Sequence, residues 1–243
     1  MDKVRLSKIM SERGLCSRRE ADAWIEKGWV FVNGEQIKEL GTRIDPDARI
    51  EISEHARREQ QRLITVILNK PVGWVSAQPE GHYRPAIELL EVQNYGGEGV
   101  PRVPNPRGLK NLAVAGRLDI DSQGLLIFTQ DGRIAKQLIE KDSGTEKEYL
   151  VRVSGEKHPD QIRMLTNGSL ELDGQRLKRA RAEWINEDQL KIVLTEGKKR
   201  QVRRMCELVG LQVRALKRVR IGQLRLGKLP EGQWRFLDDG EEF

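Results

Sequence analysis

The chain is organised around residues 116–132, which read Gly-Arg-Leu-Asp-Ile-Asp-Ser-Gln-Gly-Leu-Leu-Ile-Phe-Thr-Gln-Asp-Gly. Residues 125–129 are short, apolar and rich in strand-forming types, and the run stops at the turn dipeptide Asp131-Gly132. We therefore predict a buried strand with a polar loop before it at a sheet edge. Such loops commonly present reactive side chains. Asp119 and Asp121 are the candidates, although Asp121 could simply cap the loop backbone.

The length and composition limit the class of protein. With 243 residues, 37% of them hydrophobic and 33% charged, the chain has room for a small domain and a larger one. No apolar run approaches the roughly 18 residues of a membrane-spanning helix. The first residues are charged and lack the apolar core of a secretory signal. We predict a cytoplasmic protein without a membrane segment.

Metal and cofactor sites are not expected. The chain has two cysteines, Cys16 and Cys206, which lie far apart and form no Cys-x-x-Cys pair, and only three histidines could join them. There is no glycine-rich phosphate loop of the kinds that hold nucleotide cofactors. These patterns disfavour a disulfide framework, a zinc site and a bound organic cofactor.

The formal net charge of +6 is concentrated in patches. Segment 198–220 contains one acidic residue, Glu207, and nine basic residues: Lys198, Lys199, Arg200, Arg203, Arg204, Arg214, Lys217, Arg218 and Arg220. A second group lies near the N-terminus: Arg5, Lys8, Arg13, Arg18 and Arg19. Any one of these could merely coat a solvated helix face. Together they favour a polyanion, whose counterions are released on binding, so we predict a nucleic-acid partner.

Residues 1–53 are predicted to form a small helix-helix-hairpin domain. Its signals are apolar residues at helical spacing before Gly14, a Ser17/Glu20 capping box, and an Asn33-Gly34 turn after a short strand. Such a unit is too small to be an enzyme. Four basic residues can share one face, Arg5, Lys8, Arg18 and Arg19, and we predict that they bind structured RNA, with a protein partner as the alternative. Residues 54–62 are almost without apolar side chains and are predicted to be a linker.

Residues 63–243 are predicted to form a larger α+β domain. Strands outnumber helices and are joined by turns as well as helices, which favours a mixed, largely antiparallel sheet. Residues 94–111 are crowded with glycine and proline, so no regular element is expected there. This segment carries Arg102, Arg107 and Lys110, and it is either an RNA-contacting loop or, the reading we favour, a tolerated surface excursion.

Three strings in the larger domain resemble motifs of the pseudouridine synthases that modify bacterial ribosomal RNA. They are residues 116–132, residues 146–151 (Glu-Lys-Glu-Tyr-Leu-Val) and residues 197–205 (Gly-Lys-Lys-Arg-Gln-Val-Arg-Arg-Met). Residues 3–52 are similar to the S4-like RNA-binding domain that this branch shares with a ribosomal small-subunit protein. The resemblance therefore covers nearly the whole chain. Within this branch, the resemblance is closest to the enzymes that modify large-subunit ribosomal RNA and can also act on a tyrosine transfer RNA.

The resemblance implies a role for each motif residue. Asp119 occupies the place of the catalytic carboxylate, Tyr149 that of the tyrosine that stacks on the target base, and Arg203 that of the basic partner of the acid. By residue type alone, Tyr149 would be an ordinary core residue and the arginines would coat a helix. The remaining predicted RNA contacts in this domain are Arg117, Lys199, Arg200 and Arg204.

The predicted function is the isomerisation of uridine to pseudouridine in structured RNA, most simply large-subunit ribosomal RNA, by a monomer without a cofactor. The target uridine must leave its stack to reach a pocket, so base flipping is expected. Two alternatives remain open. One is a non-catalytic RNA-binding or ribosome-assembly protein on the same fold. The other is an RNA nucleosidase or nuclease that uses Asp119 and Asp121 as an acid and base pair.

Overall fold

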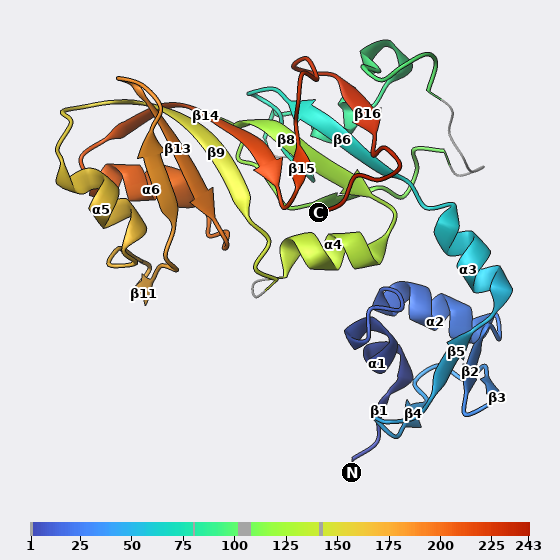
Figure 1. Cartoon of the computed structure of the whole chain (residues 1–243). Helices are drawn as coiled ribbons and strands as arrows, with labels where there is room; N and C mark the ends of the chain where they lie inside the picture. The colour runs from blue at the N-terminus through green and yellow to red at the C-terminus, as the bar shows by residue number, and fades with distance from the viewer. Residues whose placement is uncertain (1, 80, 102–107, 141–142) are drawn as a thin grey trace. The chain divides into compact units, whose positions relative to one another are not determined.

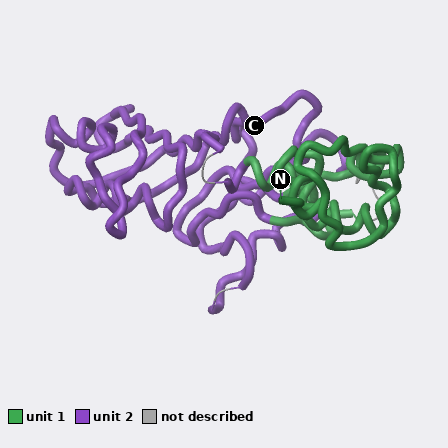
Figure 2. Tube along the Cα trace, turned by 90° about the horizontal axis from the view of Figure 1, so that it is seen from below, with its two compact units in different colours: residues 1–65, 102–113, 129–137 green, residues 66–101, 114–128, 138–243 purple. Residues whose placement is uncertain are grey.

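The computed structural model describes residues 2–79, 81–101, 108–140 and 143–243. The chain divides into two compact units (Figure 2). Unit 1 comprises residues 1–65, 102–113 and 129–137, and unit 2 comprises residues 66–101, 114–128 and 138–243. Residues Arg102 and Arg107 of the predicted insertion lie outside the described residues. Among the described residues of this segment, Asn94 ends the 3-10 helix η2 (Val92–Asn94), whereas residues 95–101 and 108–111 lie in no helix or strand, as the glycine and proline content predicts.

The N-terminal part of unit 1 has the predicted helix-helix-hairpin order (Figure 1). Its elements are β1 (Val4–Arg5), α1 (Leu6–Glu12), α2 (Arg18–Glu26), β2 (Val30–Val32), β3 (Glu35–Ile37), β4 (Arg43–Ile44) and β5 (Ile50–Ile52). Strand β2 pairs antiparallel with β3 and with β5, and β1 pairs antiparallel with β4. The capping box is confirmed: Ser17 Oγ accepts from the Glu20 backbone N–H, and Glu20 Oε2 accepts from the Ser17 N–H at 2.7 Å.

The segment predicted as a linker contains a helix, α3 (Glu54–Gln61). Ser53 caps its N-terminus by accepting from the Ala56 N–H, and Glu54 and Arg58 form an i, i+4 ion pair. These local interactions stabilise a helix with little apolar content. Among its residues only Ala56 is buried, so the helix adds little apolar contact to the small domain.

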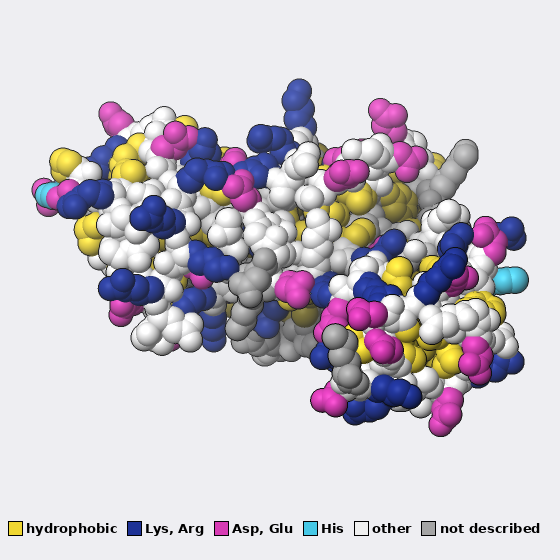
Figure 3. Space-filling view, turned by 60° about the horizontal axis from the view of Figure 1, so that its bottom comes forward, with side chains coloured by type: hydrophobic (Ala, Val, Ile, Leu, Met, Phe, Trp, Pro, Cys, Tyr) yellow, Lys and Arg dark blue, Asp and Glu magenta, His cyan; other side chains and the backbone are white. Residues whose placement is uncertain are grey.

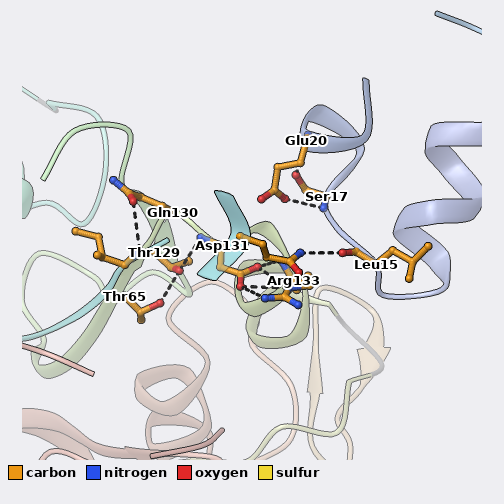
Figure 4. A network of polar contacts seen from close by, with 10 residues as sticks. Leu15, Ser17, Glu20, Thr65, Thr129, Gln130, Asp131 and Arg133 are labelled. Carbon is orange, nitrogen blue, oxygen red and sulfur yellow. Dashed lines mark hydrogen bonds and ion pairs between the residues drawn. The ribbon is translucent and has the colours of Figure 1, made fainter. Parts of the chain in front are cut away.

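A polar network in unit 1 fixes the start of α4 (Gly132–Ile139) (Figure 4). Thr65 Oγ1 and Thr129 Oγ1 share a buried hydrogen bond of 2.7 Å, and Thr129 Oγ1 also accepts from the Asp131 N–H. The Asp131 carboxylate accepts from the backbone N–H and the guanidinium of Arg133, which caps the first turn. A side chain at Gly132 would overlap that of Ser17, so this position requires glycine.

Unit 2 is built on the larger sheet, whose strand order is β12-β13-β9-β14-β8-β6-β16. The strands are β6 (Thr65–Lys70), β8 (Gln123–Thr129), β9 (Lys147–Ser154), β12 (Arg181–Trp184), β13 (Gln189–Leu194), β14 (Gln212–Ile221) and β16 (Trp234–Phe236), with β7 (Ala113–Ala115) on β8 and β15 (Leu224–Arg225) on β14. Strand β14 runs parallel to β8 and antiparallel to β9. The fold is therefore α+β with a mixed, largely antiparallel sheet, as predicted.

The remaining elements flank this sheet. They are the helices α5 (Asp160–Thr166) and α6 (Gln201–Leu208), the short 3-10 helices η1 (Ala86–Leu89) and η2 (Val92–Asn94), and the hairpin of β10 (Glu171–Leu172) and β11 (Gln175–Arg176). Strand β8 is buried over residues 124–129, which confirms the buried strand predicted after the polar loop. No helix among the described residues is long and apolar enough to cross a bilayer.

An ion-pair network ties Glu146 to two strands of the sheet. Its carboxylate accepts from Arg181 of β12 at 2.7 and 2.9 Å and from Arg220 of β14 at 3.0 Å. The hydrogen bonds from Arg181 and Arg220 lower the pKa of Glu146 from its ordinary 4.5 to about 2. A carboxylate whose pKa is lower in the folded chain stabilises it above the unfolded pKa, and this contribution is lost as the pH falls through the folded pKa.

We expect Glu146→Gln to lower the free energy of unfolding most above pH 4.5, with a difference from wild type that shrinks as the pH approaches 2. Urea unfolding at several pH values measures this difference. Glu187→Gln is the matched control, because no ion pair of Glu187 occurs among the described residues. A Glu146→Gln effect that is equal at neutral and acidic pH would contradict the assignment.

Candidate active site

The loop before β8 is held at every backbone carbonyl from residue 116 to residue 121. Side chains hold four of these carbonyls: Arg218 donates to those of Gly116 (2.9 Å) and Arg117 (3.3 Å), Ser76 Oγ donates to that of Leu118 (2.6 Å), and Arg203 donates to that of Asp121 (2.6 Å). Backbone N–H groups hold the other two: the Ser122 N–H donates to the carbonyl of Asp119 (3.1 Å), and the Gly73 N–H donates to that of Ile120 (2.8 Å). Because each carbonyl has a partner, the loop has one well-defined conformation. Its two carboxylates are placed accordingly.

Asp119 is half-buried in the middle of this loop. Its carboxylate forms no ion pair with the residues that the structure describes. The negative charge of Asp119 raises the pKa of both Lys70 and Arg200, so these two cations interact with it electrostatically. The carboxylate is thus presented beside positive charges without being tied to one of them.

Asp121 carries the ion pairs. Arg200 donates to its two carboxylate oxygens at 3.0 and 2.8 Å, and Arg203 Nε lies 3.3 Å from Oδ2. Partial burial raises the pKa of Asp121, but the hydrogen bonds from Arg200 and the charge of Arg203 outweigh burial and hold the pKa below its ordinary value. Asp121 is therefore ionised at neutral pH.

The partner predicted for Arg203 was Asp119, and the structure corrects this. Arg203, in the first turn of α6, is 7% exposed, donates a hydrogen bond to the carbonyl of Asp121 and forms an ion pair with the Asp121 carboxylate. The reason is the turn at residues 120–121, which brings Asp121 rather than Asp119 in front of the helix. Arg203 therefore acts on Asp119 indirectly, by anchoring the backbone of the loop that carries both aspartates.

A buried lysine interacts electrostatically with both carboxylates. Lys70, the last residue of β6, is 0% exposed, and its Nζ donates to the carbonyls of Pro71 (2.8 Å) and Trp74 (2.9 Å). Burial lowers the pKa of Lys70 from 10.5 to about 8, and the charges of Asp121 and Asp119 only partly offset it. At neutral pH the lysine is cationic and adds positive potential at the loop.

Tyr149 lies on β9, is 9% exposed, and stands directly opposite Arg218 of β14. Residues opposite one another in an antiparallel pair project from the same face. The guanidinium of Arg218 in turn bonds to Leu125 of β8 and to the first two carbonyls of the loop. Tyr149 and the loop that carries Asp119 are therefore connected through one arginine.

The basic segment 198–220 is less available for phosphates than its sequence indicates. Arg218 is 1% exposed and bonds to backbone carbonyls, so the prediction of a polyanion contact is wrong for this residue. Arg200 is paired with Asp121 and Arg204 with Asp173, each through two hydrogen bonds. On the face drawn in Figure 3, Lys and Arg side chains are likewise interspersed with Asp and Glu.

The other predicted RNA contacts are at the surface. Arg5, Lys8, Arg18 and Arg19 of the small domain are exposed, as are Arg117 and Lys199 of unit 2. Of these, Lys8 forms an i, i+4 ion pair with Glu12 at 3.5 Å. Exposed pairs of this kind contribute little free energy, so a phosphate can displace the carboxylate.

Three side chains that organise the site were not assigned to it from the sequence: Lys70, Ser76 and Arg218. Lys70 belongs to the string Asn-Lys-Pro-Val-Gly, residues 69–73, and a lysine that ends an apolar strand was the available signal. Ser76 and Arg218 offered none, because their partners lie 42 residues or more away along the chain. No group of three or more metal-binding side chains was found in the described part of the chain.

Comparison with known proteins agrees with this geometry. The family model described as RNA pseudouridylate synthase matches residues 64–208, and the model of the S4 domain matches residues 4–50. The dual-specificity RNA pseudouridine synthase RluF of Escherichia coli K12 is 35% identical over 98% of this chain and 77% of its own length. The ribosomal large subunit pseudouridine synthase B of the same organism is 36% identical over 96% of this chain and 79% of its own.

A solved structure supports the same assignment. A crystal structure of a pseudouridylate synthase superposes with a TM-score of 0.65 and 26% identity, covering 97% of this chain and 96% of the other. The matches thus extend over both the S4 domain and the sheet that carries the Asp119 loop. The chain belongs to the RNA pseudouridylate synthase family and is an RNA pseudouridine synthase with an N-terminal S4 domain.

Proposed function

We propose that the protein converts a uridine of large-subunit ribosomal RNA to pseudouridine, with a transfer RNA as a second class of substrate. The names of the relatives support this choice, since one is a large-subunit enzyme and the other is dual-specific. The observation that carries the catalytic proposal is the position of Asp119. Its carboxylate is held in a loop whose carbonyls are all hydrogen-bonded, beside the charges of Lys70 and Arg200.

The reaction is an isomerisation. The bond between C1′ of the ribose and N1 of uracil breaks, a bond between C1′ and C5 forms, and the C5 proton is exchanged for a proton on the freed ring nitrogen. No atom or electron is gained or lost. The site must supply a carboxylate, hold the detached base and keep water from capturing the intermediate.

Asp119 is proposed as the carboxylate that acts as nucleophile or base at the sugar or ring. Tyr149 is proposed to stack on the target base and hold it while the glycosidic bond is broken. Arg203 is proposed to act through the loop, by fixing the carbonyl and carboxylate of Asp121.

RNA binding is proposed to use exposed or half-buried basic residues of the small domain and of unit 2: Arg5, Lys8, Arg18, Arg19, Arg117, Lys199, Arg200 and Arg204. The two arginines held by carboxylates, Arg200 and Arg204, would exchange Asp121 and Asp173 for phosphate oxygens. The target base must be flipped from its stack, at a cost of a few kcal/mol that is smallest in a loop or bulge. We further propose that the enzyme acts in the cytoplasm as a monomer.

Mapping pseudouridine in cellular RNA tests the substrate. Total RNA from a bacterial strain that lacks the gene is incubated with the protein at low salt, and pseudouridine is located through its slowly reversing carbodiimide adduct. We expect a new adduct site in large-subunit ribosomal RNA that is absent with Asp119→Asn. Adducts confined to another RNA would contradict the proposed substrate. No new adduct in any RNA would favour a non-catalytic RNA-binding protein.

A further inference from the structure

A second loop lies against the loop that carries Asp119. It follows β6 and contacts the residues on either side of the aspartate. The Gly73 N–H donates to the carbonyl of Ile120 at 2.8 Å. Ser76 Oγ donates to the carbonyl of Leu118 at 2.6 Å and accepts from the Leu118 N–H at 2.8 Å. Asp119 is therefore bracketed by two residues whose backbone positions are set by this second loop.

The hydroxyl of Ser76 satisfies both backbone polar groups of Leu118. A hydroxyl can donate and accept at once, which the methyl group of alanine cannot do. Ser76 is 4% exposed and Leu118 is 7% exposed, so water has little access to replace either bond. An unpaired buried N–H or carbonyl destabilises the folded chain, because the group loses its hydrogen bond to water without gaining another. Without the hydroxyl, the backbone at Leu118 is expected to move until these groups find new partners.

This pairing is specific to Ser76. The other buried serine beside Asp119 is Ser122, which is 1% exposed, and its Oγ makes no hydrogen bond within the described residues. The other side chains that hold the loop carbonyls, Arg203 and Arg218, are charged and each bonds to more than one group. Ser76 is the neutral anchor on the residue directly before the aspartate.

We propose that Ser76 is a positioning residue for catalysis: it holds Leu118 so that the Asp119 carboxylate is presented in the reactive orientation. The proposal rests on the proposed catalytic role of Asp119. Adjacent Cα atoms are separated by about 3.8 Å. A displacement of Leu118 is therefore passed on to Asp119 with little attenuation, whereas only one of the eight proposed RNA contacts, Arg117, adjoins Leu118.

Kinetics of Ser76→Ala test this role. A misplacement of about 1 Å can cost about 10²-fold in rate, so we expect a decrease in kcat of that order. KM and the Kd for substrate RNA should stay within about twofold, because seven of the eight proposed RNA contacts lie outside the displaced loop. Ser76→Thr retains the hydroxyl and should recover most of the lost kcat. Tritium released from C5 of uridine-labelled RNA measures turnover.

The control is Thr65→Val, which removes a different buried hydroxyl bond, the one to Thr129, without touching the Asp119 loop. We expect it to lower the free energy of unfolding, as Ser76→Ala also does, yet to keep the wild-type kcat. If the wild type is active and Ser76→Ala has the same kcat, the positioning role is overturned and the proposed reaction is not. Equal losses of kcat in both variants would also overturn the positioning role. A wild type that releases no tritium would instead overturn the proposed reaction, and the positioning role with it.

Discussion

Asp119→Asn is expected to reduce turnover by more than about 10³-fold while leaving RNA affinity and its salt dependence unchanged. The amide keeps the size of the side chain but cannot act as a nucleophile or base. Asp119 forms no ion pair among the described residues, so its replacement leaves no paired guanidinium without a partner. Turnover is measured as tritium release in single-turnover reactions, and affinity is measured by filter binding at several salt concentrations.

Asp121→Asn is the matched comparison. It weakens the pairing with Arg200 and Arg203, so it should lower the stability of the loop. It should also lower the turnover rate, but the decrease in rate should be smaller than that caused by Asp119→Asn. If Asp121→Asn eliminated turnover while Asp119→Asn remained near wild type, the two carboxylates would have to exchange roles. The structure makes that comparison necessary, because Asp121 is the carboxylate that contacts Arg203.

Gly124→Ala is expected to destabilise the protein by about 3 kcal/mol or more, or to prevent folding. Gly124 has φ of +107°, and a Cβ there would overlap the carbonyl oxygen of Arg218 and lie 2.8 Å from its nitrogen. The two residues are register partners where β8 and β14 run parallel. A methyl group must therefore separate the strands that bring Arg218 to the loop. Urea unfolding of the purified variant measures the loss.

Gly174→Ala is the control that separates the backbone strain of a positive φ from the steric overlap of the added Cβ. Gly174 lies in the turn between β10 and β11 with φ of +72°, and a Cβ at this position would meet nothing within 4 Å. Alanine there has the backbone strain alone, which costs roughly 1–2 kcal/mol. If Gly174→Ala were as damaging as Gly124→Ala, the close approach of the two strands would not be the cause.

The elements of the fold could be predicted because their signals are local. The Ser17/Glu20 capping box, the Asn33-Gly34 turn and the apolar run after residue 124 each depend on residues a few positions apart. The α3 helix shows where local signals conflict. Its low apolar content indicates a linker, whereas the Ser53 cap and the Glu54–Arg58 pair favour a helix.

The site could be predicted only in part. Asp119, Tyr149 and Arg203 are predicted as site residues from motif resemblance, but the choice of Asp121 as the partner of Arg203 depends on a turn whose geometry the sequence does not display. Ser76 and Arg218 were missed for a different reason. Both act on backbone carbonyls, which every residue has, so no complementary side chain marks the contact in the sequence.

Analysis of the reaction products tests the central claim most directly. The purified protein is incubated with unmodified large-subunit ribosomal RNA, and the RNA is then digested to nucleosides and resolved by chromatography with mass detection. The account predicts that uridine is converted to a nucleoside of identical mass that elutes as pseudouridine, with Asp119→Asn forming none. Free uracil or new chain ends, in place of pseudouridine, would contradict isomerisation and indicate a nucleosidase or nuclease.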